Sequence, residues 1–152
     1  MSLEHLKKIE ILESSGFPLI IYDMERKELE RKEMLSDKKV FKSSLLVVAV
    51  QGLVDSGTVF NVVESENEKF LLVKKGPFSL VLTLDPKANA YDEKIQLFAR
   101  SVLIGFLKML EKLNIEADQL TVEEYIKRVE EPFKKLVNKI IEKVFKRLRP
   151  FI

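Results

Sequence analysis

The pattern of apolar runs near the start of the chain predicts a β-hairpin. Two segments rich in β-forming residues, Lys7–Ser14 and Phe17–Met24, flank the pair Ser15-Gly16. Such runs on either side of a short Ser-Gly connection are typical of two antiparallel strands joined by a tight turn. The alternative is a short helix over Leu3–Leu12, with apolar residues on one face.

A second apolar segment predicts a buried helix. It follows a densely charged stretch, Glu25–Lys39, which we interpret as an exposed connector. Ser36-Asp37 can cap a helix that runs to Val54, although the β-branched run Leu45–Val50 would also suit a buried strand. The apolar stretch is longer than most strands, which favours a helix, and Asp55-Ser56-Gly57 supplies a stop.

Three further runs predict consecutive strands over Thr58–Val63, Phe70–Lys74 and Phe78–Leu84. The polar turn Glu64–Glu68 separates the first two, and Gly76-Pro77 separates the second from the third. Because the connections are short, the three strands should be antiparallel neighbours.

Apolar residues at helical spacing then predict a long helix from Ile95 to Leu113. Asn89 is a plausible N-cap, with the negative charge of Asp92 close to the positive end of the helix, and Asn114 can end it.

A final amphipathic segment, Leu120–Leu148, begins with Thr121-x-x-Glu124, which has the form of a capping box. Pro132 interrupts the segment, and a proline inside a helix removes a hydrogen bond and clashes with the preceding turn. We therefore expect a kink or break near Glu130–Pro132.

The predicted order β-β-α-β-β-β-α-α, together with the opening hairpin Ile9–Asp23, resembles the longin domain and the wider roadblock/longin group with a profilin-like layout. The resemblance implies an α+β fold, an α/β sandwich in which helices flank a five-stranded antiparallel sheet. It covers Lys7–Leu113, so we expect a single domain over residues 1–152, with residues 120–149 as a C-terminal helical extension.

The resemblance also implies a role. Members of this group are typically non-enzymatic platforms that bind small GTPases, other scaffold proteins or their own copies, and we expect this chain to be a prokaryotic or archaeal member. We therefore expect a regulatory protein-binding scaffold, associated with a small GTPase and forming a homodimer, rather than an enzyme. An enzyme on a profilin-like scaffold is one alternative.

The predicted helix Ser36–Val54 carries the candidate interface. It is apolar nearly all round, so it must be buried on more than one side, either inside the domain or against a second copy. The candidate interface residues are Leu46, Val47, Ala49, Val50 and Val54.

Charge adds a second candidate surface. The chain has a formal net charge of +2, but the segment Lys134–Ile152 contains seven basic residues and a single acid, Glu142. A basic amphipathic helix suits an anionic membrane surface or an acidic partner, which gives the other alternative function, whereas a helix that only packs against the sheet would leave these cations in solvent. The candidate residues are Lys139, Lys143, Lys146 and Arg147. No nucleic acid partner is expected, because few aromatics lie among the cations.

The composition offers little chemistry. The chain has one histidine, His5, and no cysteine. Gly52–Thr58 has two glycines at phosphate-loop spacing but lacks the lysine. Alternate glutamates in Glu64–Glu68 are better explained as a solvated turn than as a cation site. We therefore expect no catalytic residue, cofactor or metal.

Composition also bears on location. The chain is 152 residues long, with no apolar run long enough for a transmembrane helix and no signal-peptide core, so a cytoplasmic location is expected. Charged residues make up 33% of the chain, mostly lysine and glutamate, as in proteins from hot environments.

Overall fold

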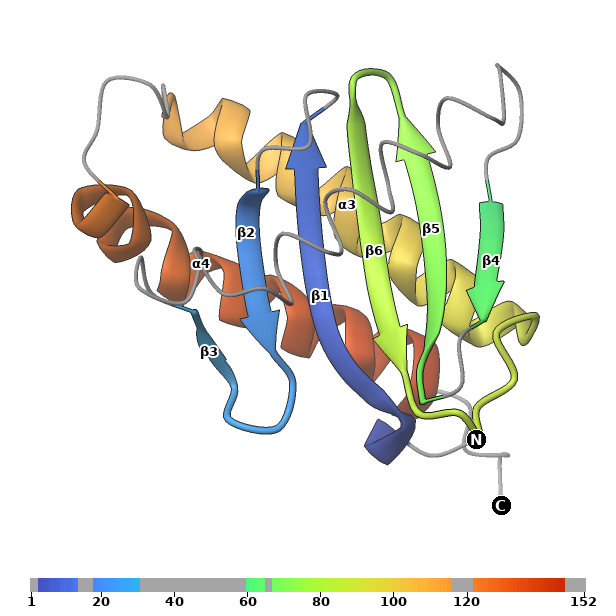
Figure 1. Ribbon diagram of the computed structural model, residues 1–152. Helices are drawn as coiled ribbons and strands as arrows, with labels where there is room; N and C mark the ends of the chain where they lie inside the picture. The colour runs from blue at the N-terminus through green and yellow to red at the C-terminus, as the bar shows by residue number, and fades with distance from the viewer. Residues whose placement is uncertain (1–2, 14–17, 31–59, 65–66, 116–121, 147–152) are drawn as a thin grey trace.

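The computed structural model describes residues 3–13, 18–30, 60–64, 67–115 and 122–146, and these form one layer of strands and one layer of helices (Figure 1). In chain order the elements are η1 Leu3–His5, β1 Leu6–Glu13, β2 Pro18–Asp23, β3 Glu28–Leu29, β4 Phe60–Glu64, β5 Lys69–Lys75, β6 Phe78–Leu84, α3 Glu93–Leu113, α4 Val122–Ile141 and the π-helical turn η3 Glu142–Lys146.

The described strands form a six-stranded sheet in the order β3-β2-β1-β6-β5-β4, and every neighbouring pair is antiparallel. The N-terminal hairpin joins the later three strands through β1 and β6, where Ile9 lies opposite Leu82. On the other side of β1, Ile9 lies opposite Tyr22 of β2. Among the described strands, β3 and β4 are therefore the two edges, at opposite sides of the sheet.

One face of the sheet packs against α3 and α4 (Figure 1). Alternate strand residues such as Ile9, Ile11, Leu80 and Leu82 are fully buried on this face. Phe133 of α4 completes the contact, with its ring centroid 5.3 Å from that of Tyr22 and 5.8 Å from that of Phe106. The helices are thus anchored by aromatic side chains in the middle of the sheet.

The second face of the sheet is also buried. Leu12, Phe70, Leu72 and Val81 form a separate apolar cluster there, and the side chain of Val63 packs against it. No described helix lies on this face. The strands are therefore buried on both sides, which explains why the apolar runs in β5 and β6 are nearly continuous.

An α+β fold with an antiparallel sheet and two helices is confirmed, but the prediction of five strands is wrong. The extra strand, β3, lies in the segment interpreted as an exposed connector. A tight turn makes it possible: Asp23 Oδ1 accepts hydrogen bonds from the backbone N–H of Glu25 and Arg26, and Lys27 adopts a positive φ of 56°. The chain then reverses, and Leu29 is only 4% exposed.

The other strands largely follow the predictions. The hairpin of β1 and β2 is confirmed, and the alternative helix over Leu3–Leu12 is wrong beyond the single turn of η1. The bounds of β6 are those predicted, β5 is one residue longer at each end, and β4 begins at Phe60 and ends at Glu64.

The helix α3 ends as predicted but begins differently. Asn114 is its C-cap, in the left-handed conformation with a φ of 52°. The N-cap is Asp92, whose carboxylate accepts a hydrogen bond from the Lys94 N–H at 2.8 Å, rather than Asn89. Asn89 instead accepts a bond from the Tyr91 N–H in the loop before the helix.

Of the predicted kink or break near Glu130–Pro132, the break is wrong, because α4 continues through the proline and ends at Ile141, whereas the kink stays a prediction. Buried residues on both sides of the proline, Val129 before it and Phe133 and Val137 after it, hold the helix against the core and outweigh the lost hydrogen bond. The predicted helix Ser36–Val54 lies outside the described residues. Of the helices that the structure describes, none is long and apolar enough to cross a membrane.

Candidate interaction surfaces

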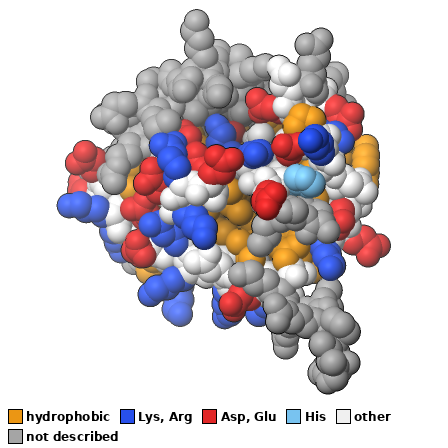
Figure 2. Space-filling model, turned by 90° about the horizontal axis from the view of Figure 1, so that it is seen from below, with side chains coloured by type: hydrophobic (Ala, Val, Ile, Leu, Met, Phe, Trp, Pro, Cys, Tyr) orange, Lys and Arg blue, Asp and Glu red, His pale blue; other side chains and the backbone are white. Residues whose placement is uncertain are grey.

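A hollow lies where the start of β1, the β2–β3 turn and the end of α4 meet. Figure 2 shows apolar side chains in it, near the single histidine, with acidic and basic side chains around them. The cavity volume is about 590 Å³, and Leu6, Met24 and Ile141 supply its apolar lining. Three glutamates and two lysines complete it together with Asn138; they are Glu4, Glu25, Glu142, Lys7 and Lys27.

Two of the charged side chains that line this hollow, Lys7 and Glu25, form an ion pair. Lys7 Nζ lies 3.3 Å from Glu25 Oε1, and both side chains are exposed, so the pair is weak. In the turn that carries Glu25, the backbone N–H groups of Glu25 and Arg26 donate hydrogen bonds to Asp23 Oδ1. Burial alone would raise the pKa of Asp23, but hydrogen bonds from the backbone and guanidinium of Arg26 outweigh it and hold the pKa below its usual value. The nine lining residues combine an apolar floor with carboxylates and amines, a lining that suits an amphipathic molecule.

The two sheet edges differ in how they are protected. The edge strand β3 has only two residues, and the N–H of Leu29 donates to Glu130 Oε2 of α4 at 3.2 Å. The guanidinium of Arg26 lies within 4.0 Å of carboxylates of Glu28 and Glu30, so charge surrounds the strand. Short length, a covered N–H and dense charge are the usual devices that keep an edge from pairing with another chain.

The edge strand β4 has none of these devices. It pairs with β5 along its whole length, from Phe60 opposite Val73 to Glu64 opposite Lys69, without a bulge. Within the described part of the chain, no strand pairs with its other side. Phe60 and Val62 pack on the helix-side core and Val63 on the second-face cluster, yet all three remain partly exposed. The strand has no proline or lysine, and its one charge is at its end.

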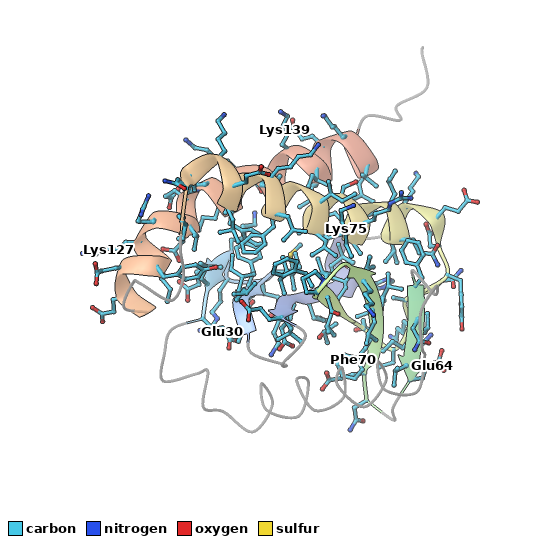
Figure 3. The ribbon with its side chains drawn as sticks, turned by 90° about the horizontal axis from the view of Figure 1, so that it is seen from above. Glu30, Glu64, Phe70, Lys75, Lys127 and Lys139 are labelled. Carbon is cyan, nitrogen blue, oxygen red and sulfur yellow. The ribbon has the colours of Figure 1, made fainter. Side chains whose placement is uncertain are left out.

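The outer surface of the helix layer is rich in cations. Lys139 and Lys143, two of the four predicted basic residues, are exposed there, and Figure 3 shows Lys139 on the side of the helices away from the sheet. The side chain of Lys146 and the whole of Arg147 lie outside the described residues, as do the candidate interface residues Leu46, Val47, Ala49, Val50 and Val54 and the loop Gly52–Thr58. The structure therefore places two of the four predicted basic side chains and none of the predicted interface residues.

Sequence analysis missed a buried carboxylate. Glu10 is fully buried on the second face of the sheet, and Lys8 Nζ lies 3.9 Å from its Oε1. Its place between Ile9 and Ile11 indicates only that it points away from the helix layer. A single alternating strand gives no sign that the opposite face is buried as well.

Two buried phenols also lie beside the helix layer. Burial raises the pKa of Tyr125 well above its usual value, with a smaller effect from the charge of Glu13, and its hydroxyl has no hydrogen-bond partner within the described part of the chain. The pKa of Tyr22 is raised by burial and then by the charge of Glu130. Both phenols therefore stay protonated at neutral pH.

The remaining candidate residues from the sequence, His5 and the glutamates of Glu64–Glu68, do not form a metal site within the described part of the chain. His5 lies in η1, where its backbone carbonyl accepts a hydrogen bond from the Asp85 N–H at 2.8 Å. Glu64 is exposed at the end of β4, and Lys69 Nζ approaches its carboxylate at 4.0 Å. Among the residues that the structure describes, no three His, Cys, Asp or Glu side chains meet in a way that could hold a metal ion.

No model of a known protein family matches this chain, and no curated protein matches it either. The resemblance to longin and roadblock domains therefore stays a prediction that rests on the opening hairpin and the order of the elements.

Proposed function

We propose that this protein is a non-catalytic protein-binding scaffold of longin/roadblock type that forms a homodimer through the edge strand β4. The observation that carries the proposal is the edge of β4, which is five residues long, regular in register and, among the residues that the structure describes, not paired with another strand on its outer side.

Pairing between two copies of β4 would satisfy backbone groups and bury apolar surface together. An antiparallel pair centred on Val62 sets Asn61 of one copy opposite Val63 of the other, and it covers side chains that a single copy leaves partly exposed. Cross-strand apolar pairs each contribute about 0.2–1 kcal/mol, so a strand of this length supports a dimer only together with its backbone hydrogen bonds. The expected dimer is therefore of moderate affinity.

The same edge could accept a strand from a different protein. The resemblance implies a small GTPase or another scaffold protein as such a partner, and strand addition is a general mode of recognition that needs only a free edge. The protein would then act by bringing partners together, with the sheet as a rigid support.

Asn61 provides the test, because it is a partly exposed polar residue in the middle of β4. In the Asn61→Lys homodimer two cations lie on the same face within one diagonal position of each other, and like charges weaken strand pairing. Multi-angle light scattering should give a dimer mass for the wild-type chain and a monomer mass for Asn61→Lys and for Asn61→Glu. An equimolar mixture of the two variants should recover the dimer, since the charges then attract.

The control is Asn67→Lys, the same substitution at an exposed residue in the turn after β4, which should leave the dimer intact. A monomeric wild-type chain at high micromolar concentration, with a folded circular dichroism spectrum, would contradict the proposal. So would an Asn61→Lys variant that keeps the dimer mass.

A further inference from the structure

The outer surface between α3 and α4 carries a line of cations, which we call the basic seam. It consists of exposed lysines and one arginine from both helices and the adjoining turn: Lys94, Lys108, Lys112, Arg128, Lys139 and Lys143. The basic surface predicted from the C-terminal segment includes only two of these six residues. The other four cations lie in α3 and in the first half of α4.

Contacts at both ends of the helices show that α3 and α4 run antiparallel. Phe98 near the start of α3 contacts Phe145 in η3, with ring centroids 5.7 Å apart. At the other end, the guanidinium of Arg128 donates to the Leu113 carbonyl at 3.1 Å. Between these points the two helices meet at Gly105 and Leu136.

The spacing of residues along each helix shows which side chains lie in line with the contact between Gly105 and Leu136. Residues 94, 97, 101, 105, 108 and 112 follow one another at intervals of three or four and form a single stripe of α3, in which Gly105 touches α4. Residues 128, 132, 136, 139 and 143 do the same along α4 and into η3, with Leu136 touching α3. The two stripes contain six cations and no acid, since Glu93, Glu111, Glu131 and Glu142 occupy other positions.

The cations of the seam are also available. All six side chains are exposed, and within the described part of the chain none of them is in an ion pair. Lys134, which lies off the stripe, shows the contrast, because its Nζ lies 3.5 Å from Glu131 Oε1. Six like charges along one line repel each other, and an anionic partner would relieve that repulsion.

The shape of the seam indicates a flat partner. The helices approach so closely that a Cβ on Gly105 would lie 2.6 Å from Leu136 Cδ1, so no groove for a peptide separates them. Within the described part of the chain, two large apolar side chains are exposed, Tyr91 at 67% and Leu97 at 52%. Both lie near the N-terminal end of α3, Tyr91 just before the helix and Leu97 within its first turns. Cations on a broad surface with a tyrosine and a leucine beside them are typical of proteins that lie on an anionic membrane.

We propose that the basic seam binds the anionic surface of a lipid bilayer, with Leu97 and Tyr91 entering the headgroup layer. The proposal is independent of dimer formation through β4, which lies in the sheet. Binding should fall as salt increases, because the exposed cations are screened over a Debye length of about 10 Å at 0.1 M ionic strength.

Sedimentation with vesicles provides the test, using phosphatidylcholine with and without phosphatidylserine at low and high salt. The wild-type chain should bind the vesicles that contain phosphatidylserine, only weakly at high salt, and should not bind pure phosphatidylcholine. Each basic residue near an anionic surface contributes about a fivefold gain in binding. The double variant Lys139→Glu/Lys143→Glu should therefore bind at least about 25-fold less well.

The matched control is Lys74→Glu/Lys75→Glu, which changes the net charge equally at two exposed lysines at the end of β5. This control should keep vesicle binding within about threefold of the wild-type chain, and Leu97→Ala should weaken the binding that persists at high salt. Equal loss in the two double variants would overturn the seam as the site, because net charge would then explain the binding. The proposal of a membrane partner would be wrong if the wild-type protein did not bind anionic vesicles. It would also be wrong if the protein bound only an acidic polypeptide such as polyglutamate.

Discussion

The close contact between Gly105 and Leu136 makes a prediction about stability that depends on both residues. Gly105 lies in the interior of α3, where alanine is favoured over glycine by about 1 kcal/mol. A Cβ added there would lie 2.6, 3.2 and 3.4 Å from Cδ1, Cδ2 and Cγ of Leu136. The leucine must therefore rotate away before the helix can gain from the alanine.

The two effects nearly cancel in the wild-type background. Leu136 is already partly exposed, so moving it into solvent costs on the order of 1 kcal/mol, less than the 1.5–3 kcal/mol for a fully buried leucine. Gly105→Ala alone should change the free energy of unfolding by less than about 0.5 kcal/mol. In a Leu136→Ala background nothing has to move, so the same substitution should stabilise the protein by about 1 kcal/mol.

Urea denaturation of the four proteins, the wild type, each single variant and the double variant, measures this coupling as a double-mutant cycle. The expected coupling energy is about 1 kcal/mol in favour of the double variant. If Gly105→Ala stabilises the protein equally in both backgrounds, the helices do not pack as closely as the structure shows, and the argument that the seam has no groove fails with it.

Two further predictions concern α4 and the β2–β3 turn. Pro132→Ala should stabilise the protein by about 2 kcal/mol in urea denaturation, because it restores a hydrogen bond in a continuous helix; a loss of stability would show that the proline ring itself is needed in the packing. Asp23→Asn should cost about 1 kcal/mol at neutral pH, since the amide oxygen can still accept from the Glu25 and Arg26 N–H groups but the substitution removes the charge and the Oδ2 that accepts from the Arg26 guanidinium at 3.2 Å. Because the pKa of Asp23 is lowered from 3.8, the stability it contributes is present above that value and is lost as the pH falls through the folded-state pKa. The gap between wild type and Asp23→Asn should therefore narrow below about pH 4, and a gap that is constant with pH would contradict the role of the charge.

The sequence pattern predicted correctly those elements whose ends are marked by local signals. The strand β6 has the predicted bounds because Gly76-Pro77 and Asp85-Pro86 mark both ends of an apolar run. Asn114 was recognised as the stop of α3 because asparagine tolerates the left-handed conformation that ends a helix. In these places local signals and tertiary packing agree.

The failures occur where tertiary contacts override the local signal. Leu29 is a single apolar residue in a charged stretch. It becomes part of a strand because the Asp23–Lys27 turn reverses the chain, so that Leu29 pairs with β2 and its N–H donates a hydrogen bond to Glu130. Pro132 stays within α4 because Phe133 is locked between Tyr22 and Phe106. Neither partner can be identified from neighbouring positions in sequence.

The same limit applies to the candidate surfaces. The basic seam joins α3 and α4 in an antiparallel arrangement, so the positions of Lys108 and Lys112 beside Arg128 follow only from the packing at Gly105 and Leu136. The two edges of the sheet give a second example. Glu130 protects the edge of β3 by accepting a hydrogen bond from Leu29, and the order of the strands in the sheet leaves β4 at the other edge. Neither fact can be predicted from residues that are close together in the sequence.

The geometry of strand pairing relates the two proposed surfaces to each other. Two identical strands that pair antiparallel at a sheet edge are related by a two-fold axis perpendicular to the sheet, and this rotation leaves each face of the sheet on its original side. The α3 and α4 layers of both copies of a β4-linked dimer would therefore lie on the same side, and both basic seams would face the same plane. A dimer could then engage one bilayer through two seams, which raises apparent affinity without new contacts. A parallel pair of β4 strands would reverse one face and direct the seams apart, so the antiparallel dimer is the form in which the edge and the seam can act together.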